Sequence, residues 1–404
     1  MVNVAVVLPS DFEQGSIGGM STAVKTFLRS TQSYPFNITL FGLCWKQEER
    51  VGRIYQRTIH GVTYPFIPLC RLTRREVDGH RPVIPLRAKM FWACLLKRQH
   101  VTQRAFDVLY LHGPELYPLM PAQRAKIIYH AHGTEEWVAQ YSRYRLCRTP
   151  AFQKLYGGLI DQIGLRADRF ICIDQQSYDT YRTRWWARTD DVRLAWGAVD
   201  ANLFSPLPST IRLAVKERYG IPRDAKVVLS IGRLTKLKGV HLVIEAMAHL
   251  ARKRSDIFLL IAGDGDEASA LRDQVIAAQL QSRVHFLGAV PFEQTPNLYA
   301  CADITVVASE QESLGFTILE SLACGTPVVS TQVGVAPHVI RERQTGFLLA
   351  HRNVEELVAG IEAGLNLPID QRAVCVETAR SFGQSAKEVC DLIMELGRDR
   401  SQCQ

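Results

Sequence analysis

Short apolar runs alternate with helix-length amphipathic segments along almost the whole chain. Eleven of these runs are rich in β-branched residues and are bounded by turn residues, which predicts strands. Continuous apolar strands separated by amphipathic helices are typical of parallel sheets covered by helices on both faces. The predicted strands are residues 3–9, 37–43, 108–114, 126–133, 169–174, 226–233, 258–263, 284–289, 304–309, 327–332 and 346–350.

A proline-rich stretch separates the two halves of this α/β pattern. Residues 204–226 carry Pro206, Pro208 and Pro222 before the strand alternation restarts. We therefore expect two α/β domains of similar size, residues 1–204 and residues 205–380. Ligands of such sheets bind at the carboxyl ends of the strands, which for two such domains means the cleft that they face.

Composition and charge narrow the function without naming it. The chain has 404 residues, 47% of them hydrophobic and 22% charged, and a net charge of +8 that favours anionic partners such as phosphates, nucleotides or acidic lipids. Nucleic acid is a poor fit because no recognised binding module accompanies the charge. The ten cysteines show no C-x-x-C spacing, and no apolar run resembles a signal peptide or a membrane span. We expect a cytoplasmic protein with reduced cysteines.

The nonapeptide "ESLGFTILE" (312–320) has a carboxylate at each end. In one continuous helix Glu312 and Glu320 would lie ~12 Å and ~80° apart, too far for the carboxylate pair of a glycoside hydrolase. The preceding residues are typical of a strand and a polar loop, and Gly315 marks the predicted helix start. We therefore expect exposed backbone N–H groups at a helix N-terminus, with one carboxylate on each side.

Two glycine-containing loops differ in how well they could bind a phosphate group. Residues 263–268, "GDGDEA", formally match a dinucleotide fingerprint, but Asp266 and Glu267 would occupy the first helical turn and repel a pyrophosphate. A capped strand-to-helix turn is favoured there over an NAD or metal site. Gly18 and Gly19 instead precede an uncharged first turn, where N–H groups can hold a phosphate. From spacing alone, an ordinary flexible loop is equally compatible.

Basic residues and histidines also follow predicted strands. Arg233, Lys236 and Lys238 stand at or just after the end of the strand predicted at 226–233, and Gly239 opens the helix that follows. The three basic residues would suit a diphosphate, although solvated surface charge is the favoured interpretation of such residues taken alone. His112 and His132 each end a strand of the first half and could orient a sugar hydroxyl or donate to developing charge. A structural histidine is the commoner role of either one alone, and His132 is the better candidate.

Taken together, these elements resemble the retaining glycosyltransferases of the GT-B fold, specifically the large family 4 group (glycosyl transferases group 1). The segments that support this resemblance are "SIGRLTKLKGVHLVIEAM", "LLIAGDGDEASAL", "VHFLGAV", "LYACADITVVASEQESLGFTILESLACGTPVVSTQVGVAPHVI" and "TGFLL". The similarity covers nearly the whole chain and is densest over residues 226–350. It implies two Rossmann-like doubly wound domains facing a cleft, with a C-terminal helix in residues 381–404 that rejoins the first domain.

The resemblance also implies roles for individual residues. Glu320 resembles the carboxylate that binds ribose, and Glu312 the one beside the donor sugar. The other implied roles are diphosphate binding by Arg233, Lys238, Gly18 and Gly19, donor-sugar binding by the backbone of Leu314, Gly315 and Phe316, and an approach of His132 to the donor sugar. We therefore expect Glu312 and His132 to be the catalytic residues. Leu314 replaces a frequent phenylalanine, and "AWGAVDANLF" (195–204) departs from the family's usual turn.

The implied reaction is retaining hexosyl transfer from a UDP- or GDP-linked sugar to a hydroxyl acceptor, in glycan, glycolipid or cell-surface polysaccharide synthesis. Arg233, Lys238 and helix N-termini would stabilise the leaving diphosphate with no metal and no cofactor. A sugar-nucleotide epimerase, a phosphorylase and a non-catalytic sugar-nucleotide-binding subunit are the alternatives. The base, the sugar, the acceptor and the oligomeric state stay open.

Residues 71–104 are the stretch least similar to the family. They hold nine Lys or Arg against two acidic residues, around the apolar patch "MFWACLL". Such a segment could touch an anionic membrane at its inner face and so reach a lipid-linked acceptor. An amphipathic helix that packs its apolar face onto the first domain is the slightly favoured alternative.

Overall fold

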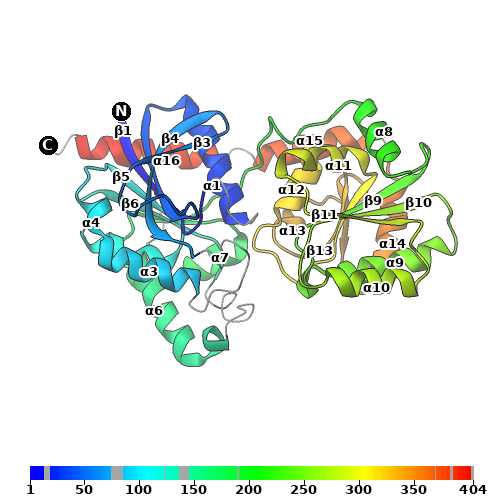
Figure 1. The fold of residues 1–404 in the computed structure, drawn as a ribbon, viewed down its shortest axis with the longest axis horizontal. Coiled ribbons are helices and arrows are strands. Elements are labelled where there is room, and N and C mark those ends of the chain that lie inside the picture. The colour runs from blue at the N-terminus through cyan, green and yellow to red at the C-terminus, as the bar shows by residue number, and fades with distance from the viewer. Residues whose placement is uncertain are drawn as a thin grey trace. The chain divides into compact units, whose positions relative to one another are not determined.

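The computed structural model describes residues 1–12, 19–73, 85–122, 124–134, 136, 145–188, 191–368, 370–382 and 385–401. The chain divides into two compact units, one formed by Met1–Ala198 with Ser385–Gln404 and the other by Val199–Gln384. Each unit is built on one sheet flanked by helices (Figure 1). This is the predicted α/β class with two Rossmann-like units.

The first unit has an eight-stranded sheet in the order β3-β4-β2-β1-β5-β6-β7-β8. All neighbouring strands are parallel except β3 and β4, which form an antiparallel pair at one edge. The central strands are almost fully buried, as their continuous apolar sequences predicted. The strands are β1 Val2–Val7, β2 Phe36–Cys44, β3 Tyr55–Ile59, β4 Val62–Arg71, β5 Val108–Leu111, β6 Lys126–Ala131, β7 Arg169–Cys172 and β8 Val192–Leu194.

Helices cover both faces of this sheet. One face packs against α1 (Gly19–Ser30) and α16 (Ser385–Ser401), which returns from the C-terminal end of the chain. The other face packs against α3 (Leu86–Lys97), α4 (Gln99–Thr102), the 3-10 helix η2 (Pro114–Ala122) and α6 (Pro150–Arg166). The remaining helices are η1 Thr31–Ser33, η3 Arg145–Arg148 and α7 Gln175–Tyr181.

The β3–β4 hairpin was absent from the sequence prediction. His60 (φ 50°) and Gly61 (φ 79°) form its tight turn. Pro65 and Pro68 interrupt β4, and β3 carries Arg57, so neither strand has the continuous apolar run from which the other strands were predicted. Arg57 is only 1% exposed and pairs with buried Glu49 through bonds of 2.6 and 2.8 Å. The short edge strand β8 was missed as well.

The second unit has a six-stranded, fully parallel sheet in the order β11-β10-β9-β12-β13-β14. In units of chain order this is 3-2-1-4-5-6, the arrangement of doubly wound dinucleotide-binding sheets. From β9 the successive strands β10 and β11 extend the sheet to one side, whereas β12, β13 and β14 extend it to the other, so β9 and β12 are neighbours at the point of reversal. The strands are β9 Lys226–Ile231, β10 Ile257–Ala262, β11 Val284–Gly288, β12 Ile304–Val307, β13 Val328–Thr331 and β14 Gly346–Leu349.

Helices α9 (Val240–Ala251), α10 (Ala268–Ala277) and α14 (Val354–Leu365) pack against one face of this sheet. Helices α11 (Thr295–Cys301) and α12 (Phe316–Ala323) lie on the opposite face (Figure 1). The remaining helices are α8 Ser209–Arg218, η4 Lys236–Lys238, η5 Phe292–Gln294, α13 Ala336–Val339 and α15 Gln371–Phe382.

The boundary between the units lies at residues 198 and 199, earlier than the predicted segment 204–226. That segment belongs to the second unit because its side chains pack there. Phe204 is buried with its ring 5.3 Å from the ring of Phe292, and Arg212 on α8 forms a 2.8 Å ion pair with Asp303. Pro206 and Pro208 therefore precede α8 and Pro222 follows it, within the second unit and not in a linker. At the C-terminal end the first unit resumes at Ser385, against the predicted residue 381.

No helix in the described ranges has both the length and the apolar character needed to cross a membrane. The nine cysteines in these ranges form no disulfide bond, and seven of them are buried.

Candidate functional site

The candidate site of the second unit lies where β9 and β12 end side by side. Arg233 and Lys238 follow β9, and Ser309 and Glu312 follow β12. The point at which a doubly wound sheet reverses its winding is where such sheets bind ligands, because the loops after the two strands diverge to opposite faces. The sheet order thus brings together predicted residues that are separated by more than 70 positions in the chain.

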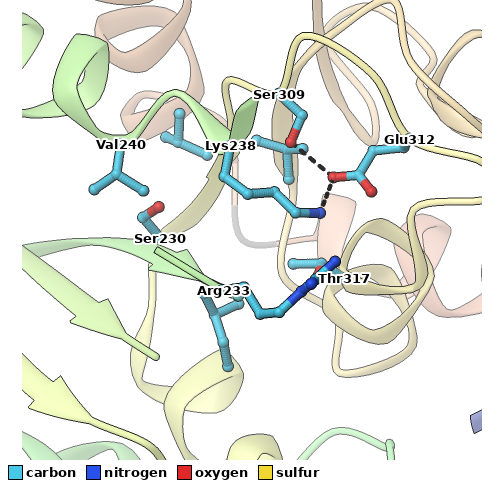
Figure 2. A pocket seen from close by; sticks show the side chains of 11 residues that line it. Ser230, Arg233, Lys238, Val240, Ser309, Glu312 and Thr317 are labelled. Atoms are coloured by element: carbon cyan, nitrogen blue, oxygen red, sulfur yellow. Dashed lines mark hydrogen bonds and ion pairs between the residues drawn. The ribbon is translucent and has the colours of Figure 1, made fainter. Parts of the chain in front are cut away.

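A small pocket opens at this edge of the sheet (Figure 2). The carboxylate of Glu312 is the hub of its polar contacts: Oε1 lies 2.5 Å from Lys238 Nζ and accepts a 2.7 Å bond from the hydroxyl of Ser309. The side chains of Lys238 and Glu312 are 27% and 15% exposed, so this ion pair is partly shielded from water. The pocket is lined by Ser230, Ile231, Gly232, Arg233, Lys238, Val240, Val306, Val307, Ser309, Glu312 and Thr317.

Arg233 reaches the same pocket without a protein partner. Its guanidinium forms no hydrogen bond or ion pair with any residue of the described ranges, although it lies at the mouth of a pocket that also holds a carboxylate (Figure 2). An unpaired guanidinium beside a lysine suits an anion that offers several oxygens, such as a diphosphate. The predicted pair of cations, Arg233 and Lys238, is therefore brought together.

The loop that carries Lys238 is held by its neighbours. Gly239 adopts a left-handed conformation (φ 69°), and a Cβ there would lie 2.1 Å from the carbonyl oxygen of Ala308. Arg352 donates to the Ala308 and Lys236 carbonyls, and the Glu310 amide donates to the Leu237 carbonyl. Only glycine permits this close approach, so the predicted helix start at Gly239 also fixes the distance between Lys238 and the β12 loop.

The "GDGDEA" loop supports the Arg233 loop instead of binding phosphate. A Cβ on Gly263 would lie 1.8 Å from the Gly232 carbonyl oxygen, and one on Gly265 would lie 2.3 Å from that of Leu234. The glycines are therefore required for contact between two backbones. One detail of the prediction is wrong: α10 begins at Ala268, so Asp266 and Glu267 precede the helix, and no side chain caps it. Asp264 instead accepts from the Gly265 amide.

Helix α12 begins at Phe316 after Gly315, as predicted. Gly315 is left-handed (φ 82°), and the Leu314 carbonyl accepts a 2.7 Å bond from the Val335 amide, which fixes the turn from its other side. Within the described ranges, the amides of Leu314, Gly315 and Phe316 donate to no protein acceptor. Three free N–H groups at a helix N-terminus can hold hydroxyl or phosphate oxygens.

Glu320 lies in the second turn of α12 and is 8% exposed. Its Oε2 accepts a 2.7 Å hydrogen bond from the hydroxyl of Tyr299 on α11. Burial raises the pKa of Glu320 to about 7, and the Tyr299 hydrogen bond opposes that rise. The carboxylate is thus held in a fixed orientation and titrates near neutral pH.

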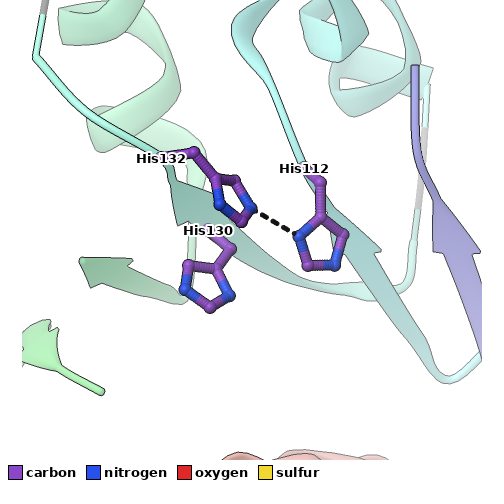
Figure 3. Close-up of side chains that lie close together, drawn as sticks. All are labelled: His112, His130 and His132. Atoms are coloured by element: carbon purple, nitrogen blue, oxygen red, sulfur yellow. Dashed lines mark hydrogen bonds between the residues drawn. The ribbon is translucent and has the colours of Figure 1, made fainter. Parts of the chain in front are cut away.

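Three histidines lie together at the carboxyl ends of β5 and β6 in the first unit (Figure 3). His112 follows β5, His130 is in β6, and His132 follows β6. His112 Nδ1 and His132 Nε2 are 3.0 Å apart, and His130 Nδ1 lies 2.6 Å from the hydroxyl of Tyr110. Burial is the main cause that lowers the pKa of all three, so the rings are neutral at pH 7.

Gly19 is the exposed first residue of α1, which follows β1. Gly18, its predicted partner in phosphate binding, lies outside the described residues, as do Glu135 and residues 137–144 after His132. The phosphate-binding prediction for this loop therefore stays a prediction.

Several residues of the site were not singled out from the sequence. Ser309 and Thr317 line the pocket, Tyr299 positions Glu320, and His130 joins the other two histidines. Ser309 and His130 carry a signal that could have found them, because each stands at the carboxyl end of a strand. Tyr299 carries none, since its contact with Glu320 joins two helices that the sequence does not show to be neighbours.

Comparisons with known proteins find similarity to glycosyltransferases. Residues 212–387 match the family described as glycosyl transferases group 1. N-acetyl-alpha-D-glucosaminyl L-malate synthase of Bacillus anthracis is 26% identical over 300 residues, 72% of each chain. Seven further curated relatives are matched over only 40–57% of their own length.

Solved structures share the fold over the whole chain. Sucrose-phosphate synthase from Thermosynechococcus elongatus has a TM-score of 0.74 at 19% identity, covering 100% of this chain and 99% of that one. Anabaena Alr3699/HepE, solved in complex with UDP and glucose, has a TM-score of 0.69 at 18% identity, covering 97% and 100%. This chain is therefore similar to the glycosyl transferases group 1 family over residues 212–387, and its two Rossmann-like units have the GT-B fold.

Proposed function

We propose that the protein is a retaining glycosyltransferase that moves a hexosyl group from a nucleoside-diphosphate sugar to a hydroxyl acceptor. The observation that carries this proposal is the pocket at the β9–β12 edge. The pocket combines an unpaired guanidinium with a lysine–glutamate ion pair, and three unsatisfied amides follow Glu312 at the start of α12, within the region that matches glycosyl transferases group 1. These groups match the charge of a diphosphate and the hydroxyls of a sugar.

Arg233 and Lys238 would hold the diphosphate and stabilise it as it leaves. Cleavage of the bond between the anomeric carbon and the phosphate oxygen gives the electron pair to that oxygen, and the two cations disperse the resulting charge. This supplies the charge stabilisation that a divalent ion provides in other transferases, so we propose that transfer is metal-independent. Activity that disappears on chelation and returns with Mg²⁺ would refute this part.

Retention follows if the acceptor attacks from the side of the leaving group. The acceptor oxygen bonds to the anomeric carbon, and its proton passes to the departing phosphate oxygen. No protein nucleophile is needed on this route. An NMR time course that resolves the anomers of the first-formed product tests it, because inversion would require a base on the opposite face of the sugar.

Glu312 has two partners in the free protein and is proposed to change them on donor binding. Its carboxylate pairs with the Lys238 ammonium at 2.5 Å. A diphosphate would draw the ammonium toward its own oxygens, since a lysine can serve more than one acceptor. Glu312 could then accept from hydroxyls of the donor sugar, with the amides of Leu314, Gly315 and Phe316 donating to the same sugar or to the distal phosphate.

Glu320 is proposed to accept hydrogen bonds from both ribose hydroxyls, with the Tyr299 hydroxyl holding the carboxylate in place. His132 is proposed to approach the donor sugar from the first unit. Burial lowers the pKa of His132, assisted by His130 and His112, so the ring would act as a neutral hydrogen-bond donor and not as a cation. Gly18 and Gly19 are proposed to contribute N–H groups to the diphosphate.

The donor is proposed to be UDP- or GDP-linked. Two solved structures on this fold were obtained with UDP-glucose and with UDP-2-fluoroglucose, and a third with ADP. A thermal-shift panel of UDP, GDP, ADP and their sugars would identify the base, because a bound ligand raises the melting temperature by mass action. Arg233→Met should abolish the shift, whereas Arg252→Met, an exposed arginine at the far end of α9, should preserve it. No shift with any nucleotide would refute the proposed function.

Helix α3 is proposed to touch an anionic membrane that carries the acceptor. Its Met90 and Cys94 pack into the core of the first unit, but Trp92 and Leu96 are 57% and 72% exposed. Exposed Lys97 and Arg98 follow at its C-terminal end. One face of α3 therefore packs onto the first unit, and the other presents apolar and basic groups that could contact a membrane, so the two roles considered for this segment are compatible.

Vesicle flotation tests the membrane contact with the variant Lys89→Glu, Lys97→Glu, Arg98→Glu. Arg87 is left unchanged because it contacts Glu115 at 3.8 Å and the Tyr156 hydroxyl at 3.3 Å, so its reversal would disturb the fold. A matched control reverses Arg218, Arg252 and Lys253, which are exposed in the second unit. We expect only the α3 variant to lose binding to phosphatidylglycerol vesicles, and equal binding of both variants would refute the contact.

A further inference from the structure

The histidine cluster of the first unit, His112, His130 and His132, has the composition of a metal site. One ring nitrogen of each histidine lies within 4.8 Å of a ring nitrogen of both others. His112 and His130 are 1% and 5% exposed, and His132 is partly exposed. The rings project from the ends of two paired parallel strands, β5 and β6, so their backbones are fixed relative to one another (Figure 3).

The cluster leaves ring nitrogens without partners. The Nε2 atoms of both His112 and His130 are buried and bond to no atom in the described part of the chain. Buried polar nitrogens in this state are costly, and they are commonly satisfied by water or by an ion. A neutral imidazole keeps one ring nitrogen with a free electron pair, which is the form that binds a metal ion.

Tyr110 gives His130 the second contact that metal-bound histidines need. Its hydroxyl is 2.6 Å from His130 Nδ1. If Nδ1–H donates to the tyrosine oxygen, the tautomer is fixed and the lone pair is on the unpartnered Nε2. A histidine ligand almost always has such a partner on its other nitrogen, which orients the ring and raises its basicity.

We propose that His112, His130 and His132 bind one divalent transition-metal ion, with Zn²⁺ as the physiological candidate. Imidazole nitrogen is a preferred ligand of zinc, and no carboxylate of the described ranges belongs to the cluster, which disfavours Mg²⁺ and Ca²⁺. Zinc–nitrogen bonds of about 2.0–2.1 Å place tetrahedral ligands about 3.3 Å apart. His112 Nδ1 and His132 Nε2 are 3.0 Å apart, close to that separation, and both can be ligands once the proton of their hydrogen bond moves to the other nitrogen of its ring.

The fourth coordination position would open toward solvent. His132 is the least buried of the three ligands, so the ion could be reached from its side of the cluster. Three protein ligands with one open position is the arrangement of catalytic zinc sites rather than closed structural ones. The metal site shares His132 with the proposed transferase site, so metal binding is measured directly and not through transferase activity.

The first experiment measures metal binding by the full chain without a histidine tag, after removal of metals with a chelator. Zn²⁺ titration by calorimetry should give one ion per chain, and Co²⁺ should give the visible absorption bands of a four-coordinate nitrogen site. His130→Asn and His132→Ala should each lower the affinity by at least tenfold. His249→Gln, which removes an exposed histidine of α9 in the second unit, should leave it unchanged.

Tyr110→Phe provides a test that keeps all three ligands. We expect it to lower the Zn²⁺ affinity about tenfold, because His130 loses the partner of its Nδ1. Circular dichroism shows whether each variant folds. His132 is partly exposed, so His132→Ala still tests the proposal if His130→Asn, which changes a buried residue, does not fold. Absence of Zn²⁺ binding, or equal affinity in the cluster variants and in His249→Gln, would overturn the proposal.

Discussion

Lys238 Nζ lies 2.5 Å from Glu312 Oε1, and the Ser309 hydroxyl donates to the same oxygen at 2.7 Å. This contact joins the loop after β9 to the loop after β12 and connects the two halves of the proposed donor site. The lysine was predicted to serve the diphosphate and the glutamate the sugar. In the free protein each instead satisfies the other, so a donor must compete with an existing ion pair for both.

Lys238→Met and Glu312→Gln should therefore have opposite effects on the binding of a nucleoside diphosphate. Loss of the lysine removes a charge-assisted contact with the diphosphate, which is worth about 1.5–3 kcal/mol, so affinity should fall about ten- to hundredfold. Glu312→Gln removes the competitor for Lys238, so affinity should be equal or higher while turnover falls. Calorimetry with UDP and initial-rate kinetics measure the two effects. A matching loss of affinity in both variants would contradict the exchange of partners.

Nucleotide binding should strengthen as the pH rises through the pKa of Glu320, which is about 7. Ionisation gives the acceptor that the two ribose hydroxyls need, so binding is weakest below pH 6 and strongest above pH 8. Tyr299→Phe removes the hydrogen bond that lowers this pKa, and the midpoint should shift upward. The dissociation constant of the nucleoside diphosphate measured across this range tests both statements.

Glu320→Gln is the control for titration of the diphosphate itself. Its binding should be weaker than that of the native protein at pH 8 and should keep only the pH dependence that the ligand brings. If the native protein and Glu320→Gln had the same profile, the titrating group would not be Glu320.

Gly263→Ala should destabilise the second unit and impair the anion site together. Gly263 has a φ of 136°, and the new Cβ would meet the Gly232 carbonyl oxygen at 1.8 Å. Strained backbone alone costs about 1–3 kcal/mol, and the Arg233 loop must also move. Gly220→Ala is the matched control, because Gly220 is also left-handed (φ 64°) but a Cβ there meets nothing within 4 Å.

Urea denaturation should give a larger loss for Gly263→Ala than for Gly220→Ala, which should cost about 1–2 kcal/mol. Only Gly263→Ala should also lose the nucleotide-induced thermal shift. Equal losses in the two variants would mean that the contact between the two glycine loops carries no weight.

Zn²⁺ should inhibit sugar transfer if both proposals hold, because coordination of His132 removes the ring that approaches the donor sugar. We expect inhibition at concentrations that saturate the histidine cluster and reversal by a chelator. His130→Asn should be less sensitive to Zn²⁺ than the native protein, with His249→Gln as the unchanged control. Zn²⁺ binding without inhibition would leave the metal site standing and exclude His132 from the reaction.

Local pattern was sufficient for much of the architecture. All eleven predicted strands exist, and the helix starts at Gly239 and Gly315 were predicted because glycine and periodicity act over a few residues. The β3–β4 hairpin was not predicted, because Arg57 and two prolines interrupt the apolar pattern of its strands. Burial of Arg57 becomes tolerable only through Glu49, a partner that the pattern of β3 does not reveal.

The sequence alone determined which residues stand near the ends of strands, and hence that Arg233, Lys238, Glu312 and His132 were candidates, while Glu320 became one through the family resemblance. It also excluded a glycosidase pair, since that argument needed only helical spacing. The tertiary structure decided which candidates meet. Strand order places β9 beside β12 and so pairs Lys238 with Glu312, while helix contacts join Tyr299 to Glu320 and the β5–β6 pairing gathers the histidines. These contacts depend on how whole strands and helices pack, which residue spacing along the chain does not encode.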